Sequence, residues 1–381
     1  MTVGCGAGDI VLVSETIDRA RSPEVSAVLC VERRAFERFG RILRHFCVGL
    51  VDQAIPLRIV GSDARIRSLC LGPVQAVVHR PLGGLAGRRR AERVLDELSA
   101  RPPTLVHAVT CESYRVAASI ADEFEADLVF GVTSLADCDE VTRFLARGDV
   151  SFQPWTQALA DVLESQLRIP VQRIEVVPPG IPVSARVAAF DHPDRAATLV
   201  STARFEGGSG MDRLILAVAQ LVERGNKLQV FLLGDGECER SLRKLVRTRN
   251  LSSSIAFAPP MDDPAPAIQS ADVFVHPSQE SAFTADTLQA MGLGVAVVTA
   301  PNDVVDHHRH GETAMVCPDA TPSALAGAIE TLLHDRAQGQ RLAVGGLEYV
   351  RLHHGVSAMA ERVAASYRKL ALTQATFPIR K

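Results

Sequence analysis

Short apolar runs alternate with amphipathic segments along most of the chain, beginning at residue 25. Residues 25–31 and 56–60 are apolar runs, and the segment 33–53 between them repeats apolar residues at helical spacing. Short apolar runs predict buried strands, and a period near 3.6 predicts a helix with one face against a sheet. The three segments therefore predict a strand, a helix and a second strand, which is the βαβ unit of a parallel sheet.

The same alternation continues towards the C-terminus. Further strands are predicted at residues 68–71, 76–79, 104–109, 127–132, 173–177, 198–202, 229–233, 255–257, 273–276, 295–299 and 314–317. Helices are predicted at residues 90–100, 113–125, 139–147, 153–166, 211–224, 238–249, 264–270, 285–291 and 322–334, with a last helical region at 337–373 that is interrupted near Gly345 and Gly346. Strands and helices that alternate at this spacing indicate an α/β protein with mostly parallel sheets.

A cluster of breaker residues divides the chain near its middle. Pro178, Pro179, Gly180 and Pro182 follow one another closely and precede an Ala-rich polar stretch. We therefore predict an N-terminal Rossmann-like domain at residues 1–180, which starts with an irregular extension over 1–22, and a C-terminal Rossmann-like domain at 181–356. Two doubly wound domains in succession leave a cleft between them, faced by the carboxyl ends of both sheets.

Composition narrows the class of protein. The chain has 381 residues, 47% of them hydrophobic, and its formal net charge of -3 gives no general attraction to nucleic acid. Its eight cysteines are scattered without a C-x-x-C pair, which predicts buried thiols in a reducing compartment and neither disulfides nor a zinc site. No secretory signal pattern begins the chain, and no apolar run approaches the roughly 20 residues that span a bilayer. We expect a cytoplasmic protein, with a peripheral position at the inner face of the membrane as the alternative.

Basic residues concentrate in two places of the predicted N-terminal domain. The outer face of its first helix carries Arg33, Arg34, Arg38, Arg41 and Arg44. This pattern fits either a solvated face or a surface that contacts an anionic lipid or an anionic acceptor. The run at residues 83–90 is the most basic short segment, and we expect it to form a mobile loop.

Polar groups suited to a ligand gather in the stretch at residues 271–300. A predicted strand ends at residue 276, and the loop after it contains Glu280, Ser281 and Thr284 before a helix begins. In a parallel sheet such a loop and the following helix N-terminus favour anions, because free backbone N–H groups and the helix dipole point at them. The stretch therefore predicts a site for a phosphorylated or sugar-bearing ligand.

Several motifs of the C-terminal domain resemble, in order, those of the retaining glycosyltransferases of family four. Thr202-Ala203-Arg204-Phe205 and the following Gly210-Met211-Asp212 are similar to the donor-phosphate loop of that family, and Gly234-Asp235-Gly236-Glu237 is similar to its Gly-x-Gly turn. Segments 271–278, 289–294 and 306–311 match as well. The resemblance implies the GT-B fold, two doubly wound Rossmann-like domains that face a cleft.

The same resemblance implies partners and residue roles. The C-terminal domain would bind a nucleotide-diphosphate sugar as donor, without metal or other cofactor, and the N-terminal domain would bind a glycan or lipid-linked acceptor. A C-terminal helix, at about residues 357–381, would pack back on the N-terminal domain. Arg204 and Glu280 are the candidate catalytic residues, and the substrate-binding candidates are Ser209, Gly210, Gly234, Gly236, Glu237, Ser281, Phe283, Thr284 and Gln289.

Histidines add one further candidate. His107 lies at a predicted strand end, which suits an acid, a base or an acceptor-positioning residue, although a core histidine is the alternative. His307, His308 and His310 lie in a loop without the spacing of a helical metal-binding pair, so we predict no metal site.

Several positions depart from the family pattern. Ser209 stands where the family has a lysine, Gln289 replaces the second of two acids, and Glu280 lies one residue before the expected place of the first acid. The first loop of the N-terminal domain lacks a Gly pair, and no His follows the strand predicted at 127–132. Two hypotheses remain open, an active glycosyltransferase with a modified donor site and a catalytically degenerate GT-B protein that acts as a binding or scaffold partner in a polysaccharide pathway. A nucleotide-sugar epimerase or a phosphorylase on the same architecture is a third.

Overall fold

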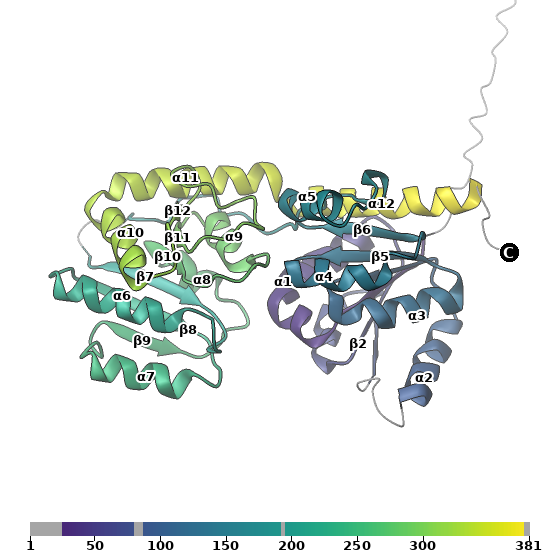
Figure 1. Ribbon diagram of the computed structural model, residues 1–381, viewed down its shortest axis with the longest axis horizontal. Helices are drawn as coiled ribbons and strands as arrows, with labels where there is room; N and C mark the ends of the chain where they lie inside the picture. Colours follow the sequence, from purple (N-terminus) through teal and green to yellow (C-terminus); the bar gives the residue numbers. More distant parts are fainter. Residues whose placement is uncertain (1–24, 80–86, 192–194, 377–381) are drawn as a thin grey trace, which may run out of the picture.

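The computed structural model describes residues 25–79, 87–191 and 195–376 as two α/β units joined side by side (Figure 1). The extension expected at residues 1–22 and residues 83–86 of the basic run lie outside the described residues. Each unit is built on one parallel sheet with helices around it, which confirms the predicted fold class of two doubly wound domains. Within the described residues, no helix is both long enough and apolar enough to cross a bilayer.

The N-terminal sheet has the strand order β3-β2-β1-β4-β5-β6, with every neighbouring pair parallel. Its strands are β1 (Ala27–Cys30), β2 (Leu57–Gly61), β3 (Gln75–Val78), β4 (Leu105–Ala108), β5 (Asp127–Val132) and β6 (Val150–Pro154). Its helices are α1 (Arg33–Asp52), α2 (Gly87–Ser99), α3 (Tyr114–Phe124), α4 (Leu135–Val141) and α5 (Gln157–Ser165). Most strand residues are buried, as expected where helices cover both faces of a parallel sheet, and the edge strand β3 is the exception.

The C-terminal sheet repeats this arrangement with the order β12-β11-β10-β7-β8-β9. Its strands are β7 (Ala197–Thr202), β8 (Leu228–Leu233), β9 (Ile255–Ala258), β10 (Val273–His276), β11 (Ala296–Thr299) and β12 (Met315–Val316). Its helices are α6 (Met211–Glu223), α7 (Glu239–Thr248), α8 (Ala265–Gln269), α9 (Ala285–Gly292), α10 (Pro322–His334) and α11 (Arg336–His353).

The last strand of the N-terminal sheet was predicted at the wrong place. Residues 150–154 form β6, so the helix predicted at 153–166 begins later, as α5, at Gln157. Thr156 caps α5, since its hydroxyl accepts a hydrogen bond from the Leu159 N–H, and this cap separates strand from helix. The predicted strand at 173–177 only runs beside β6 with a few hydrogen bonds, such as Glu175 N–H to the Phe152 carbonyl at 2.9 Å.

Two shorter segments also differ from prediction. The prediction of a weak strand at residues 68–71 is wrong, because Ala64–Leu69 forms a 3-10 helix. Asp63 caps this helix by accepting a hydrogen bond from the Arg65 N–H. The helix expected at 139–147 starts earlier, as α4, because Ser134 caps it with a hydrogen bond from the Asp137 N–H.

The helical break expected at Gly345 and Gly346 is also wrong, since both lie inside α11. A Cβ atom on Gly345 would lie 2.2 Å from the Glu312 carbonyl oxygen, and one on Gly346 would lie 3.0 Å from the Met291 side chain. These glycines therefore permit close packing of α11 against its neighbours. The helix ends instead at His353, and α12 (Val356–Thr376) follows after a short turn.

Helix α12 leaves the C-terminal domain and runs along the N-terminal one (Figure 1). It lies against α1 so closely that a Cβ atom on Gly49 would come within 2.4 Å of the Ala360 Cβ. The Arg368 guanidinium donates to the Gln53 carbonyl at 2.7 Å, just after the end of α1. Helices from near the two ends of the described chain therefore pack against each other.

An aromatic cluster joins the two domains. Phe39 on α1 and Trp155 after β6 belong to the N-terminal domain, and Phe283 belongs to the C-terminal one. The ring centroids of Phe39 and Trp155 are 4.6 Å apart, and those of Trp155 and Phe283 are 5.3 Å apart. All three side chains are buried, so apolar burial holds the domains together at this point.

Candidate active site

The loop after β7 is held by the turn after β8. The Phe205 N–H donates to the Asp235 carbonyl at 2.7 Å, and the Cys238 N–H donates to the Phe205 carbonyl at 2.7 Å. Gly234 and Gly236 have φ angles of 154° and 151°, and a Cβ atom on Gly234 would lie 1.9 Å from the Ala203 carbonyl oxygen. Glycine at both positions is therefore required for the two backbones to meet.

This arrangement places Arg204 on the side of the domain that faces α1. Its Nε lies 2.8 Å from Glu206, and its Nη1 lies 3.8 Å from Asp235 and 4.0 Å from Glu37 on α1 of the other domain. The side chain is 48% exposed, and the hydrogen bond with Glu206 raises its pKa above the ordinary value. The positive charge of Arg204 is therefore compensated by three nearby carboxylates.

A second cation lies beside the same loop. Gly210 has a φ of 75° and precedes α6, and a Cβ atom there would lie 2.4 Å from the Pro277 carbonyl and 3.0 Å from Nη2 of Arg213. The Arg213 guanidinium also donates to the Gln279 side chain at 3.3 Å. No carboxylate lies within ion-pair distance of Arg213 in the described chain, so its charge is uncompensated next to Ser209 and the N-terminus of α6.

The loop before α9 contacts the N-terminal domain through its backbone. The Leu135 N–H donates to the Ser281 carbonyl at 3.0 Å, and the Phe283 N–H donates to the Thr133 carbonyl at 2.7 Å. Ser281 keeps an exposed side chain, whereas Phe283 is buried in the aromatic cluster. Glu280, with 62% of its side chain exposed, lies 3.8 Å from Arg38 on α1.

Several buried polar atoms without a hydrogen-bond partner lie near Glu280, where β10 ends and α9 begins. Asp286 accepts a hydrogen bond from Thr202 at 2.8 Å and lies 3.7 Å from Arg41 on α1. Both ring nitrogens of His276 and Nη1 of Arg41 are buried without a partner in the described chain. Burial lowers the pKa of His276, against the opposing charges of Asp286 and Glu280, so the ring is neutral near pH 7. Buried polar atoms without partners mark a place where ligand hydroxyls can bind.

Two polar candidates remain, Thr284 just before α9 and Gln289 on it. Thr284 bonds to the Thr287 hydroxyl at 2.8 Å, and Thr287 also bonds to His307 and His308, each at 2.9 Å. Gln289 is half-buried, and its side chain makes no hydrogen bond within the described residues. Among residues 25–79, 87–191 and 195–376, no group of three or more His, Cys, Asp or Glu is arranged to hold a metal ion.

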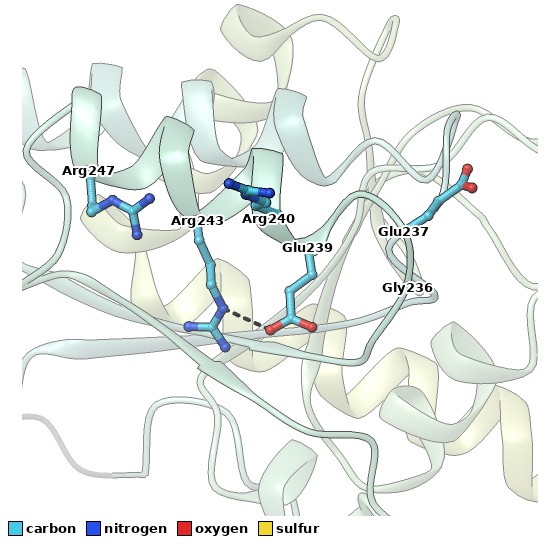
Figure 2. A pocket seen from close by; sticks show the side chains of 6 residues that line it. All are labelled: Gly236, Glu237, Glu239, Arg240, Arg243 and Arg247. Atoms are coloured by element: carbon cyan, nitrogen blue, oxygen red, sulfur yellow. Dashed lines mark hydrogen bonds and ion pairs between the residues drawn. The ribbon is translucent and has the colours of Figure 1, made fainter.

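His107 and Glu237 lie apart from these groups. His107 is buried in the N-terminal domain, where its Nδ1 is 2.6 Å from the Tyr367 hydroxyl on α12, and burial lowers its pKa to about 3. This environment is that of a core histidine. Glu237 is exposed and lines a hollow along α7 together with Gly236 (Figure 2).

Comparison with known proteins finds its family match in the C-terminal domain, which contains most of these residues. Residues 196–335 match the family described as "Glycosyl transferases group 1". Most of the C-terminal domain is therefore similar to a group 1 glycosyltransferase domain. The matched region includes Arg204, Arg213 and Glu280, but it ends before α11 and does not reach the N-terminal sheet.

Three similar proteins extend the comparison. A D-inositol 3-phosphate glycosyltransferase of Kineococcus radiotolerans is 27% identical over 82% of this chain and 83% of its own length. The lipopolysaccharide core biosynthesis glycosyltransferase LpsE of Rhizobium meliloti is 32% identical, but over only 42% of this chain and 46% of its own. The crystal structure of Anabaena Alr3699/HepE in complex with UDP and glucose superposes with a TM-score of 0.71 at 15% identity, over 90% of this chain and 99% of that one. The chain thus has the GT-B fold.

Sequence reasoning missed the groups that α1 contributes to the site. Glu37, Arg38 and Arg41 come from the helix whose arginines were interpreted as a solvated face or as a surface that contacts an anionic lipid or acceptor. In the structure they meet Arg204, Glu280 and Asp286 across the domain interface. Arg38 and Arg41 therefore have carboxylates of the other domain as partners, and their contact with a lipid or an acceptor stays a prediction. Their neighbours could be found only from the packing of the two domains, whereas Arg213 had a sequence signal, its position in the first turn after the Gly-rich loop.

Proposed function

We propose that the chain is a retaining hexosyltransferase similar to family four, which transfers a sugar from a nucleotide-diphosphate sugar to a glycan or lipid-linked acceptor. The observation that carries the proposal is the convergence of Arg204 and Glu280, from two loops of the C-terminal domain, on neighbouring residues of α1. The relatives named as glycosyltransferases and the neighbour that holds UDP and glucose support it. Retention of configuration rests on the family-four resemblance.

The diphosphate of the donor would lie at the loop before α6. Backbone N–H groups at the N-terminus of α6 and the guanidinium groups of Arg204 and Arg213 would stabilise negative charge on the leaving diphosphate as the sugar bond breaks. Arg213 would provide the second cation where Ser209 is uncharged. In this arrangement arginines and helix dipole supply the charge stabilisation that a metal ion supplies in other enzymes.

The transferred sugar would lie between α1 and the start of α9. Glu280 would accept a hydrogen bond from one sugar hydroxyl, and the unpartnered ring of His276 would bond to another. Sugar hydroxyls both donate and accept, so they suit a neutral imidazole whose two nitrogens are free. The acceptor would approach from the N-terminal domain, and we propose a cytoplasmic enzyme that works peripherally at the inner face of the membrane.

A calorimetric panel tests the donor site. Uridine, guanosine and adenosine diphosphates and their hexose conjugates are titrated into the full chain, and at least one pair is expected to bind. Absence of binding at millimolar concentration for every compound would overturn the proposal. The bound conjugate is then incubated with glycan and lipid-linked acceptors, and NMR of the product reports the anomeric configuration. Binding without hydrolysis or transfer would instead support the degenerate binding protein.

A further inference from the structure

The loop that carries Glu280 is bonded to the N-terminal domain, although it belongs to the C-terminal one. The N–H of Leu135, the first residue of α4, has no partner within its helix and donates to the Ser281 carbonyl at 3.0 Å. The Phe283 N–H donates to the Thr133 carbonyl at 2.7 Å. These two bonds flank an antiparallel bridge between the two segments, so a shift of Thr133 would move the backbone just after Glu280.

Two further hydrogen bonds hold the same loop. The Arg38 guanidinium on α1 donates to the Phe283 carbonyl at 3.3 Å and lies 3.8 Å from the Glu280 carboxylate. The side chain of Asn302, in the C-terminal domain, donates to the Ala282 carbonyl at 2.9 Å. Three of these four hydrogen bonds to the loop therefore come from the N-terminal domain, and the position of Glu280 depends on that domain.

Asp137 fixes the N-terminal side of this contact. Its residue is 2% exposed, and its Oδ2 accepts hydrogen bonds from the N–H and the hydroxyl of Thr133, both at 2.8 Å. Its Oδ1 accepts from the Cys111 N–H, also at 2.8 Å. A buried carboxylate with three donors is held in one geometry, because each broken bond would leave a buried polar group without a partner. Asp137 therefore orients the Thr133 peptide that bonds to Phe283.

The alternative is that Asp137 only stabilises α4. It lies in the first turn of that helix, where the dipole favours an acid and where Ser134 provides the cap. The three hydrogen bonds of its carboxylate, however, all go to groups outside α4, in the segments that follow β4 and β5. These bonds connect Asp137 to the contact between the domains.

We propose that Asp137 is a positioning residue, which holds Glu280 against the transferred sugar through Thr133 and the loop before α9. The inference rests on the proposed function, in which Glu280 accepts a hydrogen bond from a sugar hydroxyl. The diphosphate would bind through Arg204, Arg213 and the N-terminus of α6, and this series of contacts includes none of them. Asp137 therefore affects recognition of the sugar and not recognition of the diphosphate.

The isosteric variant Asp137→Asn tests this role. Its amide has one acceptor oxygen and one NH₂ group, so the N–H of Thr133 or that of Cys111 loses its acceptor and faces a donor. Calorimetry compares UDP-glucose, GDP-mannose and ADP-glucose with their free nucleoside diphosphates. For the pair that binds the parent chain, the ratio of conjugate affinity to diphosphate affinity should fall about tenfold, with diphosphate affinity within about twofold of the parent value. An unchanged ratio would overturn the proposal.

Asp272 provides a matched control in the C-terminal domain. It is 1% exposed and accepts hydrogen bonds from the Phe190 N–H at 3.0 Å and the Thr198 N–H at 2.8 Å. It precedes β10, whereas Glu280 follows the other end of that strand. Asp272→Asn should lower the melting temperature as Asp137→Asn does, but leave the affinity ratio within about twofold of the parent value. An equal fall in both variants would mean that lost stability alone weakens sugar binding, against the assignment to Asp137.

A milder variant decides the question if Asp137→Asn does not fold. Thr133→Val removes only the hydroxyl that donates to Asp137 and keeps the backbone groups that bond to the loop. The affinity ratio should fall in the same direction, by about two- to fivefold. If the ratio is unchanged in a folded Thr133→Val chain, Asp137 does not position Glu280 through Thr133.

Hydrogen exchange separates this proposal from the proposed function. Mass spectrometry should show faster amide exchange at residues 279–284 in Asp137→Asn, or in Thr133→Val if the first variant does not fold, because the acceptor of the Phe283 N–H is displaced. If no nucleotide or conjugate binds the parent chain, the proposed function is overturned, and faster exchange still shows that Asp137 holds the loop. Exchange at 279–284 equal to that of the parent chain would overturn the proposal whether or not a donor binds.

Discussion

The carboxylate of Asp306, in the C-terminal domain, accepts a hydrogen bond from the backbone N–H of Gln157 at 2.6 Å, at the first residue of α5 in the N-terminal domain. Its other oxygen accepts from the Ala158 N–H at 3.2 Å. A helix of one domain is thus capped by an acid of the other, where the helix dipole favours negative charge. The cap couples the stability of α5 to the position of the second domain.

Removing this cap should destabilise the folded chain. Asp306→Ala leaves two N–H groups of α5 without their acceptor, and we expect the free energy of unfolding to fall by about 1–2 kcal/mol. Urea titration followed by circular dichroism measures the change. Asp303→Ala, at an exposed position of the same loop, should change the free energy by less than about 0.5 kcal/mol, and an equal loss in both variants would contradict the cap.

Arg213 should contribute to binding of the donor diphosphate. Arg213→Ala removes the uncompensated guanidinium beside Gly210, and we expect a nucleoside diphosphate to bind about 10- to 100-fold more weakly by calorimetry. Arg224→Ala, which removes an exposed partner of Glu330 just after α6, should leave binding unchanged. Adding Ser209→Lys to Arg213→Ala should restore part of the affinity, because the new ammonium extends from the same loop. Full affinity in Arg213→Ala alone would place the diphosphate elsewhere.

The Gly-rich turns differ in what they tolerate. Gly234→Ala would place a Cβ atom 1.9 Å from the Ala203 carbonyl at a φ that alanine avoids, so we expect a loss of about 2–4 kcal/mol in the free energy of unfolding. Gly207→Ala, in the loop next to it, has nothing within 4 Å of the added methyl group and should be close to neutral. Similar melting temperatures for the two variants would show that the two backbones do not meet as described.

Buried histidines should make the fold sensitive to acid. Burial lowers the pKa of His107 and His308 to about 3 and that of His354 to about 4, so the folded state keeps them neutral where the unfolded chain is protonated. Stability is then fully present above the unfolded pKa of about 6.5 and is lost as the pH falls from there towards the folded values. In His107→Asn, the slope of the unfolding free energy against pH between about 6 and 4 should be smaller by about 1.4 kcal/mol per unit.

A core substitution without a titrating group provides the control for this slope. Val106→Ala, on the same strand, should lower the free energy of unfolding at every pH and leave its dependence on pH unchanged. Urea titrations at several pH values compare the three chains. An unchanged slope in His107→Asn would mean that the ring is protonated in the folded state.

Periodicity predicted most of the fold because burial in a parallel sheet leaves a local signature. Strand β10 and helix α10 begin and end at the predicted residues. Strand β6 was missed because Phe152 and Trp155 continue the apolar spacing of the helix that follows, and only the cap by Thr156 separates the two. Gly345 was read as a breaker, since sequence alone does not show a carbonyl 2.2 Å from its would-be Cβ.

The site was predictable only on the side of the C-terminal domain. Arg204 and Glu280 follow buried strands, so their location at one sheet edge followed from the pattern. Glu37 and Arg41 lie on the far side of the domain interface, and no local pattern relates them to residues more than a hundred positions away. His107 was chosen for its place at a strand end, but its neighbour Tyr367 comes from the other end of the chain.

The packing of α12 on α1 also constrains the order in which the chain becomes folded. During synthesis α1 emerges among the first described segments and α12 emerges last, after the whole C-terminal sheet. The face of α1 around Gly49 therefore stays uncovered while most of the protein is being translated. The N-terminal domain begins to form first and is completed last, so its final stability is acquired only when the ribosome has finished the other domain.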